Sequence, residues 1–212
     1  MKSDLPVPTE PILKQIQPPS SLILETKRLI LRPFTPNDLQ AFWSIHNDEQ
    51  VNQFLPWFRP NTLAQARELL QRQRLDFTAQ NKGYCLAICL KPDSDPIGYV
   101  KVEFDGAHDF GYGLKREFWN QHIVTEAAQA LIEQLKLDGF WWITATHDIL
   151  NPASGKVMQH LGMDYKYSYQ EQWMPKNIPV VFRLYQLNLD GIERTFQDYW
   201  NRYEQHWVET SL

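Results

Sequence analysis

Hydrophobic and polar positions alternate along several short stretches of the chain, and this period of two predicts half-buried β-strands. In the first stretch, residues 24–34, Leu29 and Leu31 face the side opposite to Ile30 and Arg32. Further strands are expected at residues 84–90, 97–104, 110–115, 140–149, 163–173 and 180–189. The stretch 140–149 is apolar on both sides, which favours a central position in a sheet.

Four other stretches repeat apolar residues every three to four positions, which predicts amphipathic helices. The longest of them spans 123–137, and the last ends at Gly162. The other three begin at residues that favour a helix N-terminus: Thr35-Pro36, Thr62 with Gln65 three positions later, and Asn151-Pro152.

The order of these elements predicts an α+β fold, with a mixed, largely antiparallel central sheet flanked by helices. Neighbouring strands without a helix between them form hairpins, and strands separated by a helix are expected to run parallel. No internal repeat is visible. One domain, residues 22–189, therefore accounts for the body of the chain.

Two terminal segments differ from this body in composition. Residues 1–21 hold five of the chain's 14 prolines and predict an extended arm. Residues 190–212 carry five acidic residues against two arginines, a net −3 out of the chain's −4, and predict an extra C-terminal helix. Its apolar positions at helical spacing are Ile192, Phe196, Tyr199, Tyr203 and Trp207. This helix either packs on its own chain or forms the contact of a homodimer.

Composition narrows the class of protein. Of the 212 residues, 43% are hydrophobic and 22% charged, which is typical of a globular protein and excludes disorder as the main state. The negative charge, without a basic cluster, argues against a nucleic-acid partner. No stretch has the apolar length of a signal peptide or a membrane helix. Cys85 and Cys89 lie roughly 13 Å apart on one strand, too far for a disulfide. We therefore expect a soluble cytoplasmic protein with buried thiols.

Candidate site residues gather where two expected strands are each followed by a helix. Tyr112-Gly113-Leu114 lie in the strand before the helix at 123, and Asn151 and Ser154 follow the strand 140–149. A helix N-terminus presents unpaired N–H groups and a partial positive charge, and both features favour phosphate binding. The sequence therefore predicts one ligand running between the two strands.

Three motifs in this order resemble the RimJ/RimL-like branch of the GNAT superfamily of N-acetyltransferases. They are LETKRLILRPFTPNDL at 24–39, GYGLKREFWNQHIVTEAAQAL at 111–131 and NPASGKVMQHLGM at 151–163. The resemblance implies a GNAT-like fold and transfer of an acetyl group from acetyl-CoA to a primary amine, either a protein N-terminus or a small amine. The amine attacks directly in a ternary complex, without a metal ion.

The resemblance also implies roles for single residues. Asn151 and Ser154 would hold the pantetheine arm, and Ser154 would protonate the departing thiolate. A backbone N–H of Tyr112-Gly113-Leu114 would polarise the thioester carbonyl. The acetyl-CoA-binding residues implied in full are Tyr112, Gly113, Leu114, Trp119, Asn120, Gln121, His122, Ile123, Val124, Thr125, Asn151 and Ser154.

The phosphate-binding loop departs from the family pattern of Arg or Gln, two residues, Gly, one residue, and Gly or Ala. The matching positions here are Trp119, His122 and Val124. Glycine tolerates a positive φ and close approach, whereas histidine does not. Two interpretations follow. Either the backbone at His122 is right-handed and the ring points outward, or the ring occupies the diphosphate site and weakens binding.

The general base is not fixed by any motif. Glu171 follows Tyr165, Tyr167 and Tyr169, so we expect these side chains to share one strand face and to surround a carboxyl group of raised pKa. Glu103, Asp109 and a water molecule are the alternatives. The acceptor pocket is expected around the aromatic residues Trp43, Phe54, Trp57 and Phe58. The alternative to an enzyme is a GNAT-like binding module whose altered loop has lost turnover.

Overall fold

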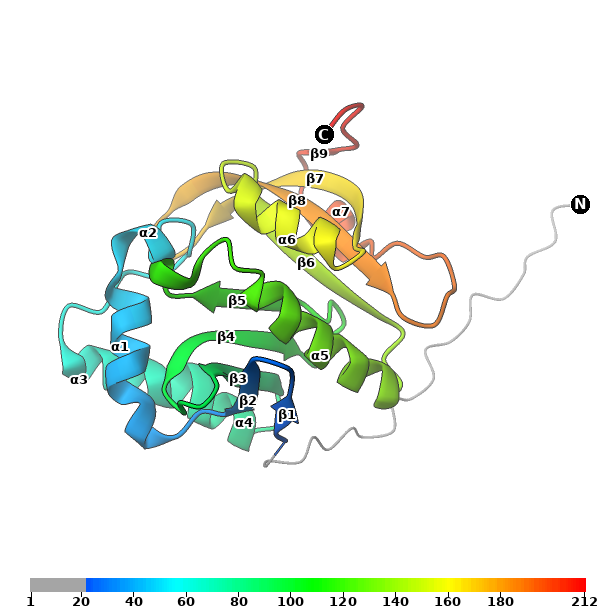
Figure 1. The fold of residues 1–212 in the computed structure, drawn as a ribbon. Helices are drawn as coiled ribbons and strands as arrows, with labels where there is room; N and C mark the ends of the chain where they lie inside the picture. The colour runs from blue at the N-terminus through cyan, green and yellow to red at the C-terminus, as the bar shows by residue number, and fades with distance from the viewer. Residues whose placement is uncertain (1–21) are drawn as a thin grey trace, which may run out of the picture.

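Two antiparallel sheets form the body of the chain in the computed structural model, which describes residues 22–212 (Figure 1). The expected arm at 1–21 lies outside these residues. The first sheet has the order β1 (Leu24–Glu25), β2 (Leu29–Pro33), β3 (Gly83–Leu90), β4 (Pro96–Glu103) and β5 (Phe110–Leu114). The second has the order β6 (Trp142–Asp148), β8 (Ile178–Asn188), β7 (Asp164–Trp173) and β9 (His206–Trp207).

One parallel bridge, between Asp109 and Thr144, joins β5 to β6 and so connects the two sheets. Beyond the bridge the two strands separate as they lead to α5 (Ile123–Leu137) and α6 (Pro152–His160) (Figure 1). The predicted mixed, largely antiparallel α+β fold is therefore confirmed.

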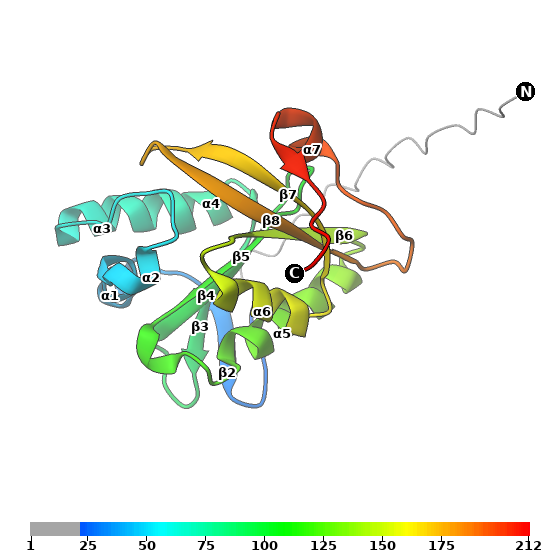
Figure 2. The ribbon, with the colours of Figure 1, turned by 90° about the horizontal axis from the view of Figure 1, so that it is seen from above.

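The remaining helices lie on the other side of the sheets, as Figure 2 shows. The 3₁₀ turn η1 (Pro36–Asp38) leads into α1 (Leu39–Asn47) and α2 (Glu49–Asn52). The next helix begins as α3 (Leu63–Leu70), widens into the π-helical turn η2 (Gln71–Leu75) and ends as α4 (Asp76–Ala79). A second 3₁₀ turn, η3 (Arg116–Phe118), lies between β5 and α5.

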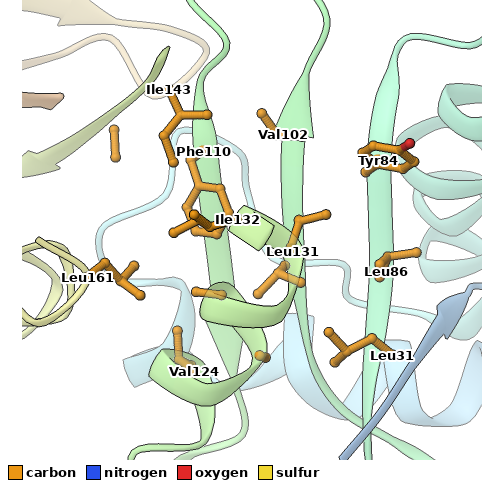
Figure 3. Packing of buried hydrophobic residues seen from close by; sticks show 14 of the residues in the cluster. Leu31, Tyr84, Leu86, Val102, Phe110, Val124, Leu131, Ile132, Ile143 and Leu161 are labelled. Carbon is orange, nitrogen blue, oxygen red and sulfur yellow. The ribbon is translucent and has the colours of Figure 1, made fainter. Parts of the chain in front are cut away.

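The main core fills the space between α5 and the sheets (Figure 3). Leu131 and Ile132 of α5 are at most 1% exposed and pack with Val102 and Phe110 of the first sheet. Ile143 of β6 joins the same cluster. Burial of each such side chain is worth about 1.5–3 kcal/mol, so α5 fixes both sheets to each other.

A second core lies on the opposite face of the first sheet, under α1 and α3, and this face is called the α1 face below. Phe42, Leu70 and Tyr99 pack there. Cys85 and Cys89 belong to the same cluster as buried free thiols, which confirms the expectation from their spacing. Within residues 22–212, no helix is long and apolar enough to cross a membrane.

The C-terminal segment corrects one expectation. Helical structure in residues 190–212 is confined to α7 (Asp198–Arg202), and the chain then turns to pair β9 with β7. Four aromatic residues of this segment pack on the chain's own second sheet: Phe196, Tyr199, Trp200 and Tyr203. They lie against Tyr167, Tyr169 and Phe182 of that sheet. Helical spacing misled the prediction because the β7 backbone offers hydrogen bonds that compete with a helix. A homodimer through this segment remains a prediction.

Candidate active site

The edges of β5 and β6 that face each other carry backbone groups without a partner strand. Glu103 N donates to the Asp109 oxygen and Lys115 N donates to the Ile97 oxygen. Hydrogen-bonded pairs recur at every second residue, so Gly111 and Gly113 also bond to β4. Tyr112 and Leu114 then direct their N–H and C=O groups away from β4, toward β6.

The same reasoning applies to β6. Ile149 N donates to the Val181 oxygen and Leu189 N donates to the Trp141 oxygen, so odd-numbered residues of β6 bond to β8. Thr144 N donates to the His108 oxygen across the bridge, and Thr146 lies next on this edge. An extended ligand with amide groups therefore finds donors and acceptors on both diverging edges that no strand pairs with, as in strand addition, although the Leu114 oxygen already accepts from Trp119.

A hydrogen-bonded pair of hydroxyl groups links β5 to α6. The Tyr112 hydroxyl lies 2.8 Å from both the Ser154 carbonyl oxygen and Ser154 Oγ. Burial raises the pKa of Tyr112, while the Ser154 hydrogen bond opposes the shift. The phenol therefore stays protonated and can donate. Asn151 forms no side-chain cap on α6, so helix capping does not account for its side chain.

The loop before α5 keeps a backbone suited to glycine although it contains none. Asn120 has φ 59° and His122 has φ 55° and ψ 21°, both left-handed. The interpretation that His122 is right-handed is therefore wrong. A residue other than glycine in this conformation costs roughly 1–2 kcal/mol. The His122 ring is nevertheless exposed and lies edge-on to His160 of α6, with 5.8 Å between ring centroids.

The N-terminus of α5 leaves three donors free. Its first intrahelical bond runs from Glu126 N to the His122 oxygen, so the N–H groups of Ile123, Val124 and Thr125 have no acceptor within the helix. Ile123 and Val124 are 1% and 9% exposed, and their side chains pack in the main core. These residues can therefore contribute to phosphate binding only through the backbone.

A partly exposed brace, formed by Thr26, Arg28 and Glu126, holds this N-terminus against the β1–β2 hairpin. The Glu126 carboxylate accepts hydrogen bonds from Thr26 Oγ1, Arg28 N and Arg28 Nε at 2.5, 3.0 and 2.6 Å. Arg28 also donates to the Gln121 oxygen. Burial raises the pKa of Glu126, but the hydrogen bonds from Thr26 and Arg28 outweigh it and leave the pKa lowered. Sequence reasoning missed this brace because Arg28 and Glu126 are far apart along the chain.

The α1 face of β5 is open at Gly111 and covered at Gly113. Nothing lies within 4 Å of a side chain built on Gly111. At Gly113 such an atom would lie 2.6 Å from Tyr99 Cε1, so the Tyr99 ring fills the space that we expected a ligand to approach. Asp109 lies on the same face, two residues before Gly111.

Asp109 is the carboxylate on this face with the most perturbed environment. Its Oδ1 is buried and has no hydrogen-bond partner among the described residues. Burial raises the pKa of Asp109 to about 7; Lys101 opposes this rise, while Glu103 and Asp105 add to it. Glu103, in contrast, forms an ion pair with Lys101 at 2.5 Å. Asp109 therefore has the properties of a proton acceptor near neutral pH.

Glu171, the other candidate base, already forms a hydrogen bond with Tyr203 of the C-terminal segment. Burial and a hydrogen bond with Glu171 raise the pKa of Tyr203. The prediction that Tyr165, Tyr167 and Tyr169 share one strand face is wrong for Tyr165. A β-bulge between Tyr165 and Tyr167 shifts the register of β7. Tyr165 packs against the main core, and Tyr167 and Tyr169 lie in the cluster under the C-terminal segment.

Two further residues of the loop form hydrogen bonds to backbone oxygens nearby. Trp119 is 40% exposed and donates from Nε1 to the Leu114 oxygen at 2.9 Å. Gln121 donates to the Glu117 oxygen. The structure thus brings the predicted residues of β5, the loop, α5 and α6 together around the diverging edges. Residues 22–212 contain no cluster of three or more metal-ligating side chains.

Comparison with known proteins decides the family. Residues 28–164 match the model of an acetyltransferase (GNAT) domain. The chain belongs to the GNAT acetyltransferase family. As a GNAT protein it is an acyl-CoA-dependent acetyltransferase, and the family resemblance seen in the sequence is confirmed.

Relatives and solved structures agree with this assignment. The chain is 26% identical over 147 residues to an uncharacterized N-acetyltransferase, YnaD, of Bacillus subtilis (strain 168), a match that covers 66% of this chain and 81% of YnaD. It shares the fold of RimL, a ribosomal L7/L12 α-N-protein acetyltransferase, in complex with coenzyme A (TM-score 0.70, 15% identity, 81% of this chain and 100% of that one). It also shares the fold of the microcin C7 self-immunity acetyltransferase MccE in complex with acetyl-CoA and AMP (TM-score 0.67, 18% identity, 77% of this chain and 93% of that one).

Proposed function

We propose that this GNAT protein transfers the acetyl group of acetyl-CoA to a primary amine, a protein N-terminus or a small amine, by direct attack in a ternary complex. The observation that carries the proposal is the arrangement at the diverging edges. Free amides of β5 lie beside the Tyr112–Ser154 hydroxyl pair and next to the open N-terminus of α5.

The residues present fit acetyl-CoA. The free N–H groups of Ile123, Val124 and Thr125 would bind the diphosphate, helped by the helix dipole. The left-handed backbone at His122, which matches a glycine of the family pattern, is a conformation that glycine adopts readily, so the loop keeps this shape without the glycine. The pantetheine amides would pair with the edges of β5 and β6, and the Asn151 side chain is free to join them.

Three tasks of the reaction fall to groups of this chain. A β5 amide, from Tyr112 or Leu114, would stabilise the negative charge that develops on the thioester oxygen. As the new C–N bond forms and the C–S bond breaks, Ser154 Oγ would give a proton to the departing sulfur, with the Tyr112 hydroxyl hydrogen-bonded to Ser154 Oγ. Ser154 would then regain a proton from water, and the proton taken from the amine would be released to water. The amine would lose its proton to Asp109, directly or through water. Glu171 is the alternative base.

Thiol release in the presence of acetyl-CoA and a panel of amines tests the proposal. Transfer to at least one class of amine, reduced in Ser154→Ala, is the expected result. A protein that binds acetyl-CoA but releases no thiol with any amine or peptide N-terminus would favour the binding module instead.

A further inference from the structure

Arg74 is a buried arginine without a carboxylate partner. It is 3% exposed and lies in the π-helical turn η2, on the α1 face of the first sheet. Its guanidinium carbon is 4.1 Å from the centre of the Tyr99 ring and 5.6 Å from the centres of the Phe34 and Phe42 rings. No carboxylate of residues 22–212 lies within ion-pair distance of it.

The hydrogen bonds of Arg74 leave one edge of its guanidinium open. Nη1 donates to the Gln73 oxygen at 3.2 Å, Nη2 lies 3.4 Å from His46 Nε2, and the guanidinium also hydrogen-bonds to the Cys85 thiol. Nε has no hydrogen-bond partner among the described residues. The edge formed by Nε and Nη2 is one that binds a carboxylate through two parallel hydrogen bonds.

His46 cannot neutralise this charge. Its Nδ1 lies 3.0 Å from the Phe42 carbonyl oxygen, which only accepts, so Nδ1 carries the proton and Nε2 faces Arg74 as an acceptor. Burial and the charge of Arg74 lower the pKa of His46 to about 3, and the ring is neutral at physiological pH. The aromatic rings stabilise the charge in part, but a buried charge without a counter-ion is unfavourable and therefore points to a ligand that supplies the counter-charge.

Arg74 lies close to β5, the strand whose amides would bind the acetyl group. The Tyr99 ring separates it from Gly113, because an atom built at Gly113 Cβ would lie 2.6 Å from Tyr99 Cε1. Single π-helical turns inside α-helices are frequent at functional sites. The turn η2 directs Arg74 to the α1 face of β4, the strand paired with β5, and the acceptor amine would approach on this face under the proposed mechanism.

Two further cations lie on the same side of the molecule. Lys176, in the turn between β7 and β8, lies 3.4 Å from the Asn52 carbonyl oxygen, and burial together with the charge of Arg59 lowers the pKa of Lys176. Asn52 is 2% exposed, and its side chain donates to the Ile45 oxygen, the residue next to His46. The nearest carboxylate to Arg59 is Glu49, at 4.0 Å and 82% exposed, which is a weak pair.

We infer that the acceptor of this acetyltransferase carries a carboxylate besides its amine, and that Arg74 binds this carboxylate. The inference rests on the proposed function, since it assigns the acceptor of the same site. Because Arg74 is 3% exposed, docking requires a neighbouring side chain to move, and the weak contact with His46 is the one expected to break. Arg59 and Lys176 then draw the same negatively charged acceptor toward the α1 face.

Matched acceptors test the inference by activity. Each pair has the same amine and differs only in a carboxylate or a carboxamide: amino acids against their amides, and peptides with glutamate against the same peptides with glutamine. We expect kcat/KM to favour the carboxylate at least tenfold in the wild type. Arg74→Met keeps the apolar stem and should abolish the preference, whereas Arg72→Met, in the same turn but exposed, should preserve it. Equal use of both members of every pair by the wild type would overturn the inference.

A second measurement does not depend on turnover. In a nitrogen-15 NMR spectrum, the Nε–H signal of Arg74 is identified by its absence in Arg74→Met. Glutarate, which has carboxylates but no amine, should shift this signal, and glutaramide should not. An unmoved signal at saturating glutarate would overturn the carboxylate site. Loss of acetyl-CoA binding and turnover with every amine would instead contradict the proposed function, so the two failures are distinguishable.

Discussion

The hydroxyl oxygen of Tyr112 lies 2.8 Å from Ser154 Oγ, and this contact joins β5 to α6 at the point where β5 and β6 have diverged. Tyr112 belongs to β5, the strand whose amides would bind the acetyl carbonyl, and Ser154 belongs to the first turn of α6. The phenol, which burial keeps neutral, would therefore hydrogen-bond to Ser154 Oγ while Ser154 gives its proton to the departing sulfur.

Removal of this hydroxyl pair should slow the chemical step more than it weakens binding. Ser154→Ala is expected to lower kcat about 100-fold, with little change in the KM for acetyl-CoA, because proton donation matters only as the C–S bond breaks. Tyr112→Phe should have a smaller effect, and the double variant should be no worse than Ser154→Ala. Fully additive losses in steady-state kinetics would show that the two hydroxyls act separately.

Asp109 should govern the pH dependence of the reaction. With its pKa raised to about 7, the carboxylate form that accepts a proton becomes dominant only as pH rises through 7. We expect the rate to rise with pH across this range in the wild type, and Asp109→Asn to lose about 100-fold or more in kcat together with this pH limb. If Glu171→Gln rather than Asp109→Asn removes the limb, Glu171 is the base.

The same residue links stability to pH. The pKa of Asp109 is higher in the folded state than its ordinary value of 3.8, so the folded protein binds the proton more tightly between about pH 4 and 7. Stability from this group is fully present below about pH 4 and is lost as pH rises through 7. Asp109→Asn should therefore stabilise the protein at pH 8 relative to the wild type, and have less effect at pH 4.5, in thermal unfolding.

The variant His122→Gly tests two effects of the histidine in the phosphate-binding loop, namely its cost to folding stability and its effect on the affinity for acetyl-CoA. Because His122 has φ 55°, glycine removes left-handed strain, partly offset by the greater freedom of the unfolded chain, for a net gain of up to about 1 kcal/mol. Asn120→Gly should gain less, since asparagine tolerates this conformation. The exposed ring leans toward His160, so we expect the Kd for acetyl-CoA to stay within about threefold. A much tighter Kd in His122→Gly would show that the ring obstructs the diphosphate.

The C-terminal segment is held by an ion pair. Glu209 bonds to Arg183 at 2.9 and 2.5 Å and accepts from Ser168 Oγ at 2.6 Å. The Arg183 hydrogen bond lowers the pKa of Glu209, so its stabilisation is present above the ordinary value of 4.5 and lost as pH falls below it. Glu209→Gln should reduce stability by about 1–2 kcal/mol at pH 7, a few degrees in Tm, and by less at pH 3.5.

The sequence predicted the fold where pattern and packing agree. The alternating strands, the helix at 123–137 and the helix that begins at Pro152 all form, because each presents one apolar face to the main core. The site residues at Tyr112 and Ser154 were predicted from the motifs, and the structure brings them into contact.

The misses have local physical causes. The bulge before Tyr167 moves Tyr165 to the other face of β7, and no residue type signals it in advance. His122 adopts a backbone that its side chain disfavours, because the Glu126 brace and the start of α5 fix the loop. Arg74 was not singled out from the sequence, because the helical pattern gives no sign of the π-helical turn in which Arg74 lies buried.

Isothermal titration of the protein with acetyl-CoA tests the central claim most directly, because it measures the loop, the α5 N-terminus and the diverging edges together. We predict one site per chain with a micromolar Kd, accompanied by a rise in Tm at saturating acetyl-CoA. An absence of both heat and thermal shift would contradict the claim that this chain works as an acetyl-CoA-dependent N-acetyltransferase.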